Sequence, residues 1–204
     1  MTDPGGVRPG PGVKLRVRTG GGPARLPHRG TCRVDPGRTA AATLAGRGRA
    51  GRAQRLREPE IAQWNPSPGG TDLPGALDWI RRRADWSDGD HASFAVCRPD
   101  DGLLLGSVSL HRIHAGDASI GYWTVPAARG QGVATRAVQE VTAWAFPQFG
   151  LHRIELCHAV ANVASCRVAE RAGYPAEGTL RQSYRYGDGR RYDEHLHARL
   201  VTDV

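Results

Sequence analysis

The chain has 204 residues, a length that supports one well-buried domain with a tail and not two full-sized domains. Its net charge of +8 is uneven, because residues 1–57 carry 13 basic and 2 acidic side chains whereas residues 58–204 carry 15 and 18. The first 57 residues contain no aromatic side chain for base stacking, which disfavours nucleic-acid binding by the basic segment. The sequence has no run of 18 apolar residues and no apolar stretch typical of a signal peptide, so we expect a cytoplasmic protein without a membrane partner.

Residues 1–57 form a low-complexity segment that is rich in Gly, Pro, Arg and Ala. Such a composition buries too little apolar surface to offset the entropy lost on ordering, so we expect disorder there. One exception is the strict alternation over residues 13–18, which predicts an edge strand. The composition changes near Pro59, and we assign the globular domain to residues 58–204.

The first half of this domain contains signals for a helix and a hairpin. Thr71 or Asp72 is a suitable N-cap for a helix that continues to about Ala84. Two apolar runs follow, Ser93–Arg98 and Leu103–His111, and the four residues between them favour a turn. These runs predict a β-hairpin.

The second half alternates strands with helices and closes with another hairpin. The expected strands are Ser119–Val125, His152–Val160, Leu180–Tyr186 and Tyr192–Leu200, and the expected helices are 133–145 and 163–172. This order predicts an α/β (α+β) domain with a single mixed sheet.

A glycine-containing segment, residues 125–134, connects the third strand to the helix that begins near Val133. Small residues let the backbone approach a ligand closely, and free N–H groups at a helix N-terminus suit a pyrophosphate. The segment lacks the Gly-Lys-Ser/Thr of a Walker A loop and the third glycine of a dinucleotide fingerprint. Taken alone, the glycine pair also fits a tight turn into a structural helix.

The segment resembles the hallmark Arg/Gln-x-x-Gly-x-Gly/Ala of the GNAT superfamily of acetyl-CoA-dependent N-acetyltransferases, matched here by Arg129, Gly132 and Ala134. Ile120-Gly121-Tyr122-Trp123 before it and the Asn162-to-Gly178 succession after it resemble the RimJ/RimL-type (ribosomal-protein-alanine N-acetyltransferase-like) branch. The resemblance implies a GNAT-type acyl-CoA N-acyltransferase fold, whose mixed, mostly antiparallel sheet is flanked by helices.

The same resemblance implies a binding site for acetyl-CoA. Val125 would hydrogen-bond the pantetheine arm, and Asn162, otherwise an ordinary N-cap, would contact it as well. Ser165, otherwise a solvated helix residue, would protonate the departing sulfur. The pyrophosphate would be held by backbone groups of Arg129, Gly130, Gln131, Gly132, Val133 and Ala134.

The chemistry also needs a neutral amine, and hence a candidate base. Glu194 shares a predicted strand face with apolar residues, and burial there would suit it to proton abstraction, whereas a shift of one residue would leave it in water. Related enzymes can carry a carboxylate on the preceding strand, where this sequence offers Tyr184.

His195 and His197, two residues apart, and His111 and His114, three apart, are spaced closely enough to share a zinc ion. With no clear third ligand nearby, we expect no metal. The four cysteines have no CxxC spacing.

The sequence therefore favours an acetyl-CoA-dependent N-acetyltransferase whose acceptor is a primary amine, most simply a protein N-terminal α-amine. Alternatives are a small-molecule acceptor such as an aminoglycoside or polyamine, and a catalytically inactive acetyl-CoA-binding domain. A homodimer remains open.

Overall fold

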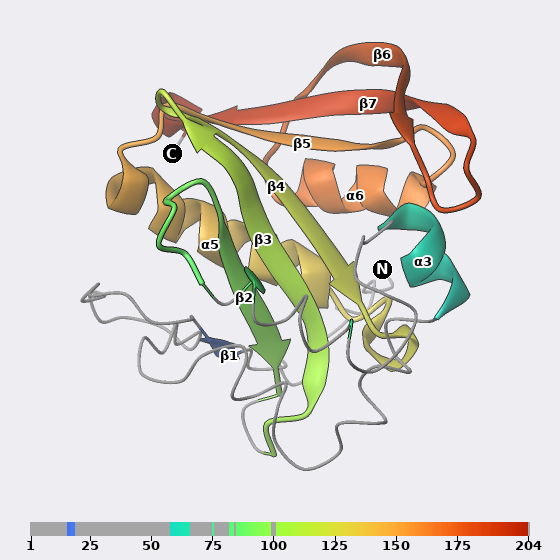
Figure 1. Cartoon of the computed structure of the whole chain (residues 1–204), viewed down its shortest axis with the longest axis horizontal. Helices are drawn as coiled ribbons and strands as arrows, with labels where there is room; N and C mark the ends of the chain where they lie inside the picture. The colour runs from blue at the N-terminus through green and yellow to red at the C-terminus, as the bar shows by residue number, and fades with distance from the viewer. Residues whose placement is uncertain are drawn as a thin grey trace, which may run out of the picture.

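A seven-stranded sheet forms the body of the protein, in the order β1-β2-β3-β4-β5-β7-β6 (Figure 1). The computed structural model describes residues 16–18, 58–65, 75, 82–83, 85–98 and 101–203. Neighbouring strands are antiparallel except for β4 and β5, which are parallel. The predicted mixed, mostly antiparallel sheet is therefore confirmed. The strands are β1 Arg16–Arg18, β2 Ala92–Cys97, β3 Leu104–His114, β4 Asp117–Thr124, β5 Arg153–Ala159, β6 Ala176–Arg185 and β7 Arg191–Leu200.

The β1–β4 part of the sheet follows the predicted hairpin. β2 and β3 pair antiparallel, and Gly102 in their connection has the positive φ of 71° that favours glycine. Residues 99–100 of the predicted turn lie outside the described residues. Residues 16–18 pair with β2 as the predicted edge strand, whereas residues 13–15 lie outside the described part of the chain.

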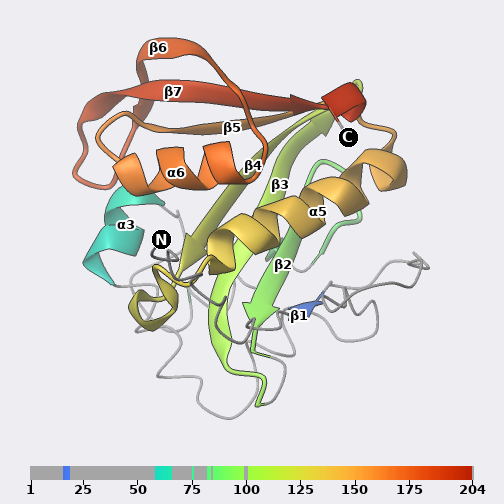
Figure 2. The same cartoon turned by 180° about the vertical axis from the view of Figure 1, so that it is seen from behind.

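Helices α5 (Val133–Phe149) and α6 (Val163–Arg171) lie on the same face of the sheet (Figure 2). Both were predicted, although α5 extends four residues beyond the expected end. It ends at Gly150, which adopts the left-handed conformation typical of a helix C-terminus. The apolar side of α5 packs against the sheet. The core at this contact includes Phe94, Val108, Leu110, Ile120, Ile154, Leu156, Val133, Ala137, Val138, Val141 and Ala145.

A short helix that the sequence reasoning missed, α3 (Pro59–Trp64), lies beside the β6–β7 turn (Figure 1). Glu58 caps its N-terminus and Pro59 occupies the first helical position, a combination that signals a helix start. The Gly187 N–H donates to the Gln63 carbonyl at 3.0 Å. A side chain at Gly187 would place its Cβ 2.1 Å from the Ala62 oxygen, so the contact requires glycine.

Most of the predicted helix near residues 71–84 lies outside the described residues, where only Gly75, Arg82 and Arg83 are helical. The basic N-terminal segment also lies outside them, apart from residues 16–18. None of the helices in the described ranges is long and apolar enough to cross a membrane. Two short 3-10 turns, η1 (Pro126–Ala128) and η2 (Val201–Asp203), complete the structure.

Candidate active site

The parallel strands β4 and β5 part from one another after a short paired stretch (Figure 1). They pair only over residues 117–119 and 153–155. Beyond these residues β4 continues to pair with β3, and β5 continues to pair with β7. A wedge therefore opens between two strands that are each hydrogen-bonded on their outer side only.

The alternation of the ladders identifies the main-chain groups that face this wedge. The Val125 N–H donates to the Leu105 oxygen at 2.9 Å, so that pair faces away from the wedge and the N–H and C=O of Thr124 and Tyr122 face into it. On the opposite strand the Val160 N–H donates to the Asp193 oxygen at 2.9 Å. The main-chain groups of Cys157 consequently face the wedge from β5, whereas the Ala159 oxygen accepts the Asn162 N–H at 2.8 Å.

The glycine-containing loop lies at the end of β4 and leads directly into α5. Gly130 and Gly132 have φ values of 71° and 70°, a conformation that disfavours side chains with a Cβ. Gly132 is the N-cap of α5, so no side chain caps the helix, and its first turn contains no acidic residue. The N–H groups of Gly130, Gln131 and Gly132 have no acceptor among the described residues. With the orphan N–H groups of the first helical turn, the loop forms a positive, open anion seat.

The Arg129 side chain points away from this seat toward α3. Its Nη2 donates to Glu58 Oε2 at 2.6 Å and its Nη1 donates to Glu60 Oε2, while its main-chain N–H is used by the Pro126 oxygen. Burial alone would raise the pKa of Glu58, but hydrogen bonds from Arg129 and the Ile61 N–H, together with the charge of Arg129, lower it. Arg129 thus ties the loop to α3.

Helix α6 brings two of the predicted site residues to the wedge. Asn162 Oδ1 accepts the Ser165 N–H at 3.2 Å, so Asn162 does cap the helix. Ser165 is half-buried and lies beside Tyr122 of β4, whose phenol oxygen is buried without a hydrogen bond in the described structure. Burial raises the pKa of Tyr122 to about 12, against a smaller opposing effect of the Ser165 hydroxyl. Tyr122 was not among the predicted catalytic residues, although it lies in the motif before the loop.

Glu194 is buried, with 7% of its surface exposed, and two hydroxyls donate hydrogen bonds to its carboxylate. Ser183 Oγ and the Tyr186 hydroxyl donate to its two carboxylate oxygens at 2.7 and 2.8 Å. Burial and the adjacent carboxylate raise the pKa of Tyr186. A bulge in β6 directs Ser183 toward Glu194, a feature that strand alternation does not reveal. Tyr184 is 46% exposed and its ring lies 5.1 Å from that of Tyr186.

The histidines are arranged differently from the sequence expectation. His195 and His197 do have neighbours suited to metal binding, because His158 and Cys166 bring their ligand atoms to within 4.8 Å of them and of each other. The premise that no third ligand lies nearby was therefore wrong.

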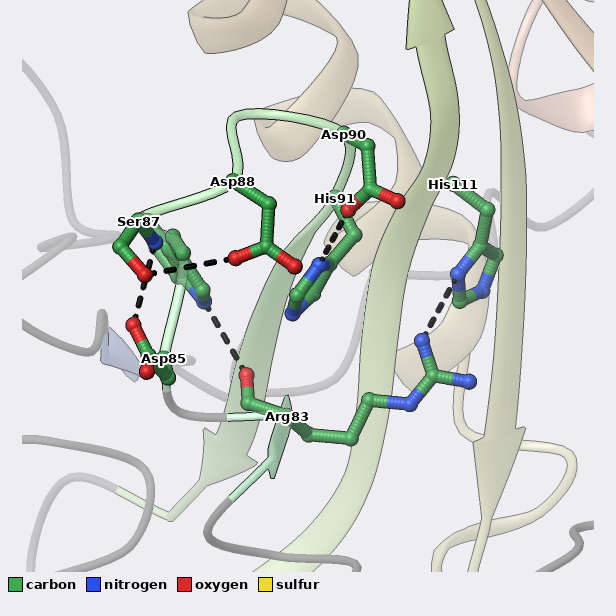
Figure 3. Close-up of polar contacts among 8 residues, drawn as sticks. Arg83, Asp85, Ser87, Asp88, Asp90, His91 and His111 are labelled. Carbon is green, nitrogen blue, oxygen red and sulfur yellow. Dashed lines mark hydrogen bonds and ion pairs between the residues drawn. The ribbon is translucent and has the colours of Figure 1, made fainter.

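The other histidine pair, His111 and His114, is not part of such a group. His111 Nδ1 accepts a hydrogen bond from Arg83 Nη1 at 3.0 Å (Figure 3), and His114 is exposed. Burial, followed by the charge of Arg83, lowers the pKa of His111 to about 4. Arg83 is itself half-buried.

Together, the parted strands, the open anion seat and the neighbouring hydroxyls define a GNAT-type acetyltransferase. The chain matches the acetyltransferase (GNAT) domain over residues 50–175 and belongs to that family.

Named relatives agree with this assignment. The chain is 35% identical to the Bacillus subtilis (strain 168) protein named "Putative ribosomal N-acetyltransferase YdaF", over 69% of this chain and 75% of that protein. It is 32% identical to the ribosomal-protein-serine acetyltransferase of Escherichia coli (strain K12), over 53% of this chain and 60% of that protein. Among solved structures, Mycobacterium smegmatis RimJ in complex with CoA-disulfide superposes with a TM-score of 0.67, at 26% identity over 78% of this chain and 79% of that one.

The contact between Glu58 and Arg129 generates a prediction about stability and pH. Because the pKa of Glu58 is lower in the folded protein than its ordinary value of 4.5, its ionised form stabilises the fold above that value. This contribution is lost as the pH falls through the folded pKa. Urea unfolding should therefore show Glu58→Gln to be less stable than wild type at pH 7, with the difference shrinking below pH 4.5.

The control for this experiment is Glu140→Gln on α5. Burial raises the pKa of Glu140, so removing its charge should not destabilise the protein at pH 7. A Glu58→Gln deficit that stays constant from neutral to acidic pH would show that the charge of Glu58 is not what holds α3 to the loop.

Proposed function

We propose that this GNAT acetyltransferase uses acetyl-CoA to acetylate the α-amine at a protein N-terminus, with the site assembled around the wedge between β4 and β5. The observation that carries the proposal is the open wedge adjacent to an uncapped helix N-terminus. A wedge of unpaired main-chain groups suits an extended, amide-containing arm, and the helix terminus suits a pyrophosphate.

The residues for acetyl-CoA follow from the contacts described above. The pyrophosphate would be held by main-chain N–H groups of Gly130, Gln131, Gly132, Val133 and Ala134, while the Arg129 N–H already has a partner. For the pantetheine arm we add Thr124 to the predicted Val125 as a binding residue. The Val125 N–H already donates to Leu105, whereas the main chain of Thr124 faces the wedge. Asn162 would contribute from the opposite side, through the amide group that its capping role leaves unused.

Acetyl-CoA supplies an activated acetyl thioester, and the protein must then manage two protons. The hydroxyl of Ser165, beside the phenol of Tyr122, would protonate the leaving sulfur. The raised pKa of Tyr122 keeps its phenol protonated at neutral pH, so it can donate to Ser165 or to an oxygen on the reacting acetyl group.

The base would act from the other face of the sheet. Glu194 and His195 are successive residues of β7, so their side chains point to opposite faces, and the histidine cluster lies on the face of α6. An amine approaching past the exposed ring of Tyr184 would reach the carboxylate of Glu194, which Ser183 and Tyr186 hold in place. Proton removal and proton donation would then occur on opposite sides of the wedge.

Two considerations favour a protein α-amine as acceptor. An α-amine with a pKa of about 7.8 is about a quarter neutral at pH 7.4, whereas a lysine amine near 10.4 is neutral in only about one molecule in a thousand. The names of the relatives also refer to ribosomal proteins. We place the reaction in the cytoplasm, in keeping with the three free cysteines among the described residues.

Calorimetric titration with acetyl-CoA tests the anion seat. Gly132→Asp should weaken binding at least tenfold more than Gly132→Asn, because the two side chains match in shape and both tolerate a left-handed backbone, but only Asp repels a pyrophosphate. Equal affinities of the two variants would contradict the pyrophosphate assignment.

The acceptor is tested separately, by following thiol release with two peptides that share one sequence containing a single lysine. One has a free α-amine, and the other has an acetylated α-amine, so that its lysine is the only amine left to react. We expect the peptide with the free α-amine to react at least ~100-fold faster at pH 7.4. With that peptide, Ser165→Ala should lower the kcat by about 10²- to 10⁴-fold with little change in the Kd of acetyl-CoA. Faster turnover of an aminoglycoside or polyamine would overturn the acceptor and leave the cofactor site standing.

A further inference from the structure

Four side chains with metal-binding atoms converge between α6 and the sheet. His158 on β5 and His195 on β7 are directly opposite in the ladder, and His197 lies two residues further on the same face of β7. Cys166 approaches from α6. One ligand atom from each lies within 4.8 Å of all the others.

The hydrogen bonds of two of these rings fix where their protons are. His158 Nδ1 lies 2.9 Å from the Ala159 oxygen, and His197 Nδ1 lies 3.0 Å from the Tyr174 oxygen. A carbonyl oxygen can only accept, so both Nδ1 atoms carry the hydrogen. In neutral rings both Nε2 atoms are then bare acceptors, yet these atoms face each other at 3.3 Å. Two acceptor nitrogens at this distance repel each other unless a proton or a metal cation lies between them.

The separation matches one edge of a tetrahedral zinc site. Two nitrogens that each lie about 2.0–2.1 Å from an ion at the tetrahedral angle are about 3.3–3.4 Å apart. Metal-binding histidines also commonly donate their second ring N–H to a backbone carbonyl, as His158 and His197 do here.

We propose that the protein binds one Zn²⁺ through His158, His195, His197 and Cys166. Three imidazoles and one thiolate form a ligand set that zinc prefers, and four protein ligands make a closed, structural site. His158 and His197 are buried, whereas His195 and Cys166 are half-buried and provide a route of entry from solvent.

The geometry favours a metal ion over a proton shared by two rings. A shared proton would involve only His158 and His197, whereas ligand atoms of His195 and Cys166 lie within 4.8 Å of both. Zinc binding would form a Zn–S bond and release the Cys166 thiol proton to solvent. Glu170 Oε1, 3.7 Å from Cys166 Sγ, could balance the added positive charge.

The site would fasten α6 to β5 and β7. Cys166 follows Ser165 directly, and Asn162 lies one turn earlier. Zinc would therefore fix the helix that carries two residues of the proposed acetyltransferase site without taking part in acetyl transfer itself.

The test uses the full-length chain, purified without a metal-affinity tag. Elemental analysis should find about one zinc per chain, and zinc added back to chelator-treated protein should raise its Tm. Cobalt in place of zinc should show an intense thiolate-to-metal absorption band. The proposal would be overturned if the protein retained no zinc and its Tm did not rise when zinc was added.

Matched variants test the ligand assignment. His195→Gln and Cys166→Ser should lower zinc affinity by more than the roughly 10- to 100-fold typical of losing a second-shell partner. His152→Gln, at an exposed histidine, and Cys157→Ser should leave it unchanged. Circular dichroism of the metal-free forms checks that each variant folds. An equal loss in the controls, or bound cobalt without a thiolate band, would contradict the four-ligand site.

Discussion

The separation of β4 from β5 is the constraint on which the rest of the structure depends. The two strands pair over three residues each and then diverge, although main-chain groups of Tyr122, Thr124 and Cys157 still face the gap between them. An unpaired strand edge within a sheet is costly unless water or a ligand satisfies it. The gap therefore presents main-chain groups that water or a ligand can satisfy.

Several contacts keep the gap open. β4 is held by β3 and β5 by β7 over their full lengths, so neither strand can shift sideways without breaking its outer ladder. Helix α5 crosses from the end of β4 to the start of β5 and packs its apolar side beneath both. At the mouth of the gap, Arg129 connects the loop to α3, and α3 contacts the β6–β7 turn through Gln63 and the ring of Trp64. The two halves of the sheet are thus joined around the gap.

The sequence predicted this arrangement well wherever local patterns determine it. The seven strands, α5 and α6 follow from periodicity, caps and glycines, and the loop motif identified the family. For Glu194 the sequence left burial and exposure both open, and the structure shows it buried. The ladder alternation that turns Thr124 toward the gap depends on the exact partner of Val125, which a sequence pattern does not specify.

Features that depend on long-range contacts were missed. The bulge that brings Ser183 to Glu194 has no clear local signal. His158, Cys166 and His197 come together from three different elements. Cys166 follows His158 by eight residues and His197 follows Cys166 by 31, a spacing that resembles no short metal-binding motif. Helix α3 is the exception, because Glu58 and Pro59 gave a readable start signal.

Hydrogen–deuterium exchange resolved to single amides, with and without CoA, tests most directly whether the gap is the binding site. The account predicts that CoA slows exchange at Tyr122 and Thr124, at residues 130–135, and at Cys157, with little change along β2. Binding of CoA that leaves these amides unprotected, or protects a different surface, would contradict it.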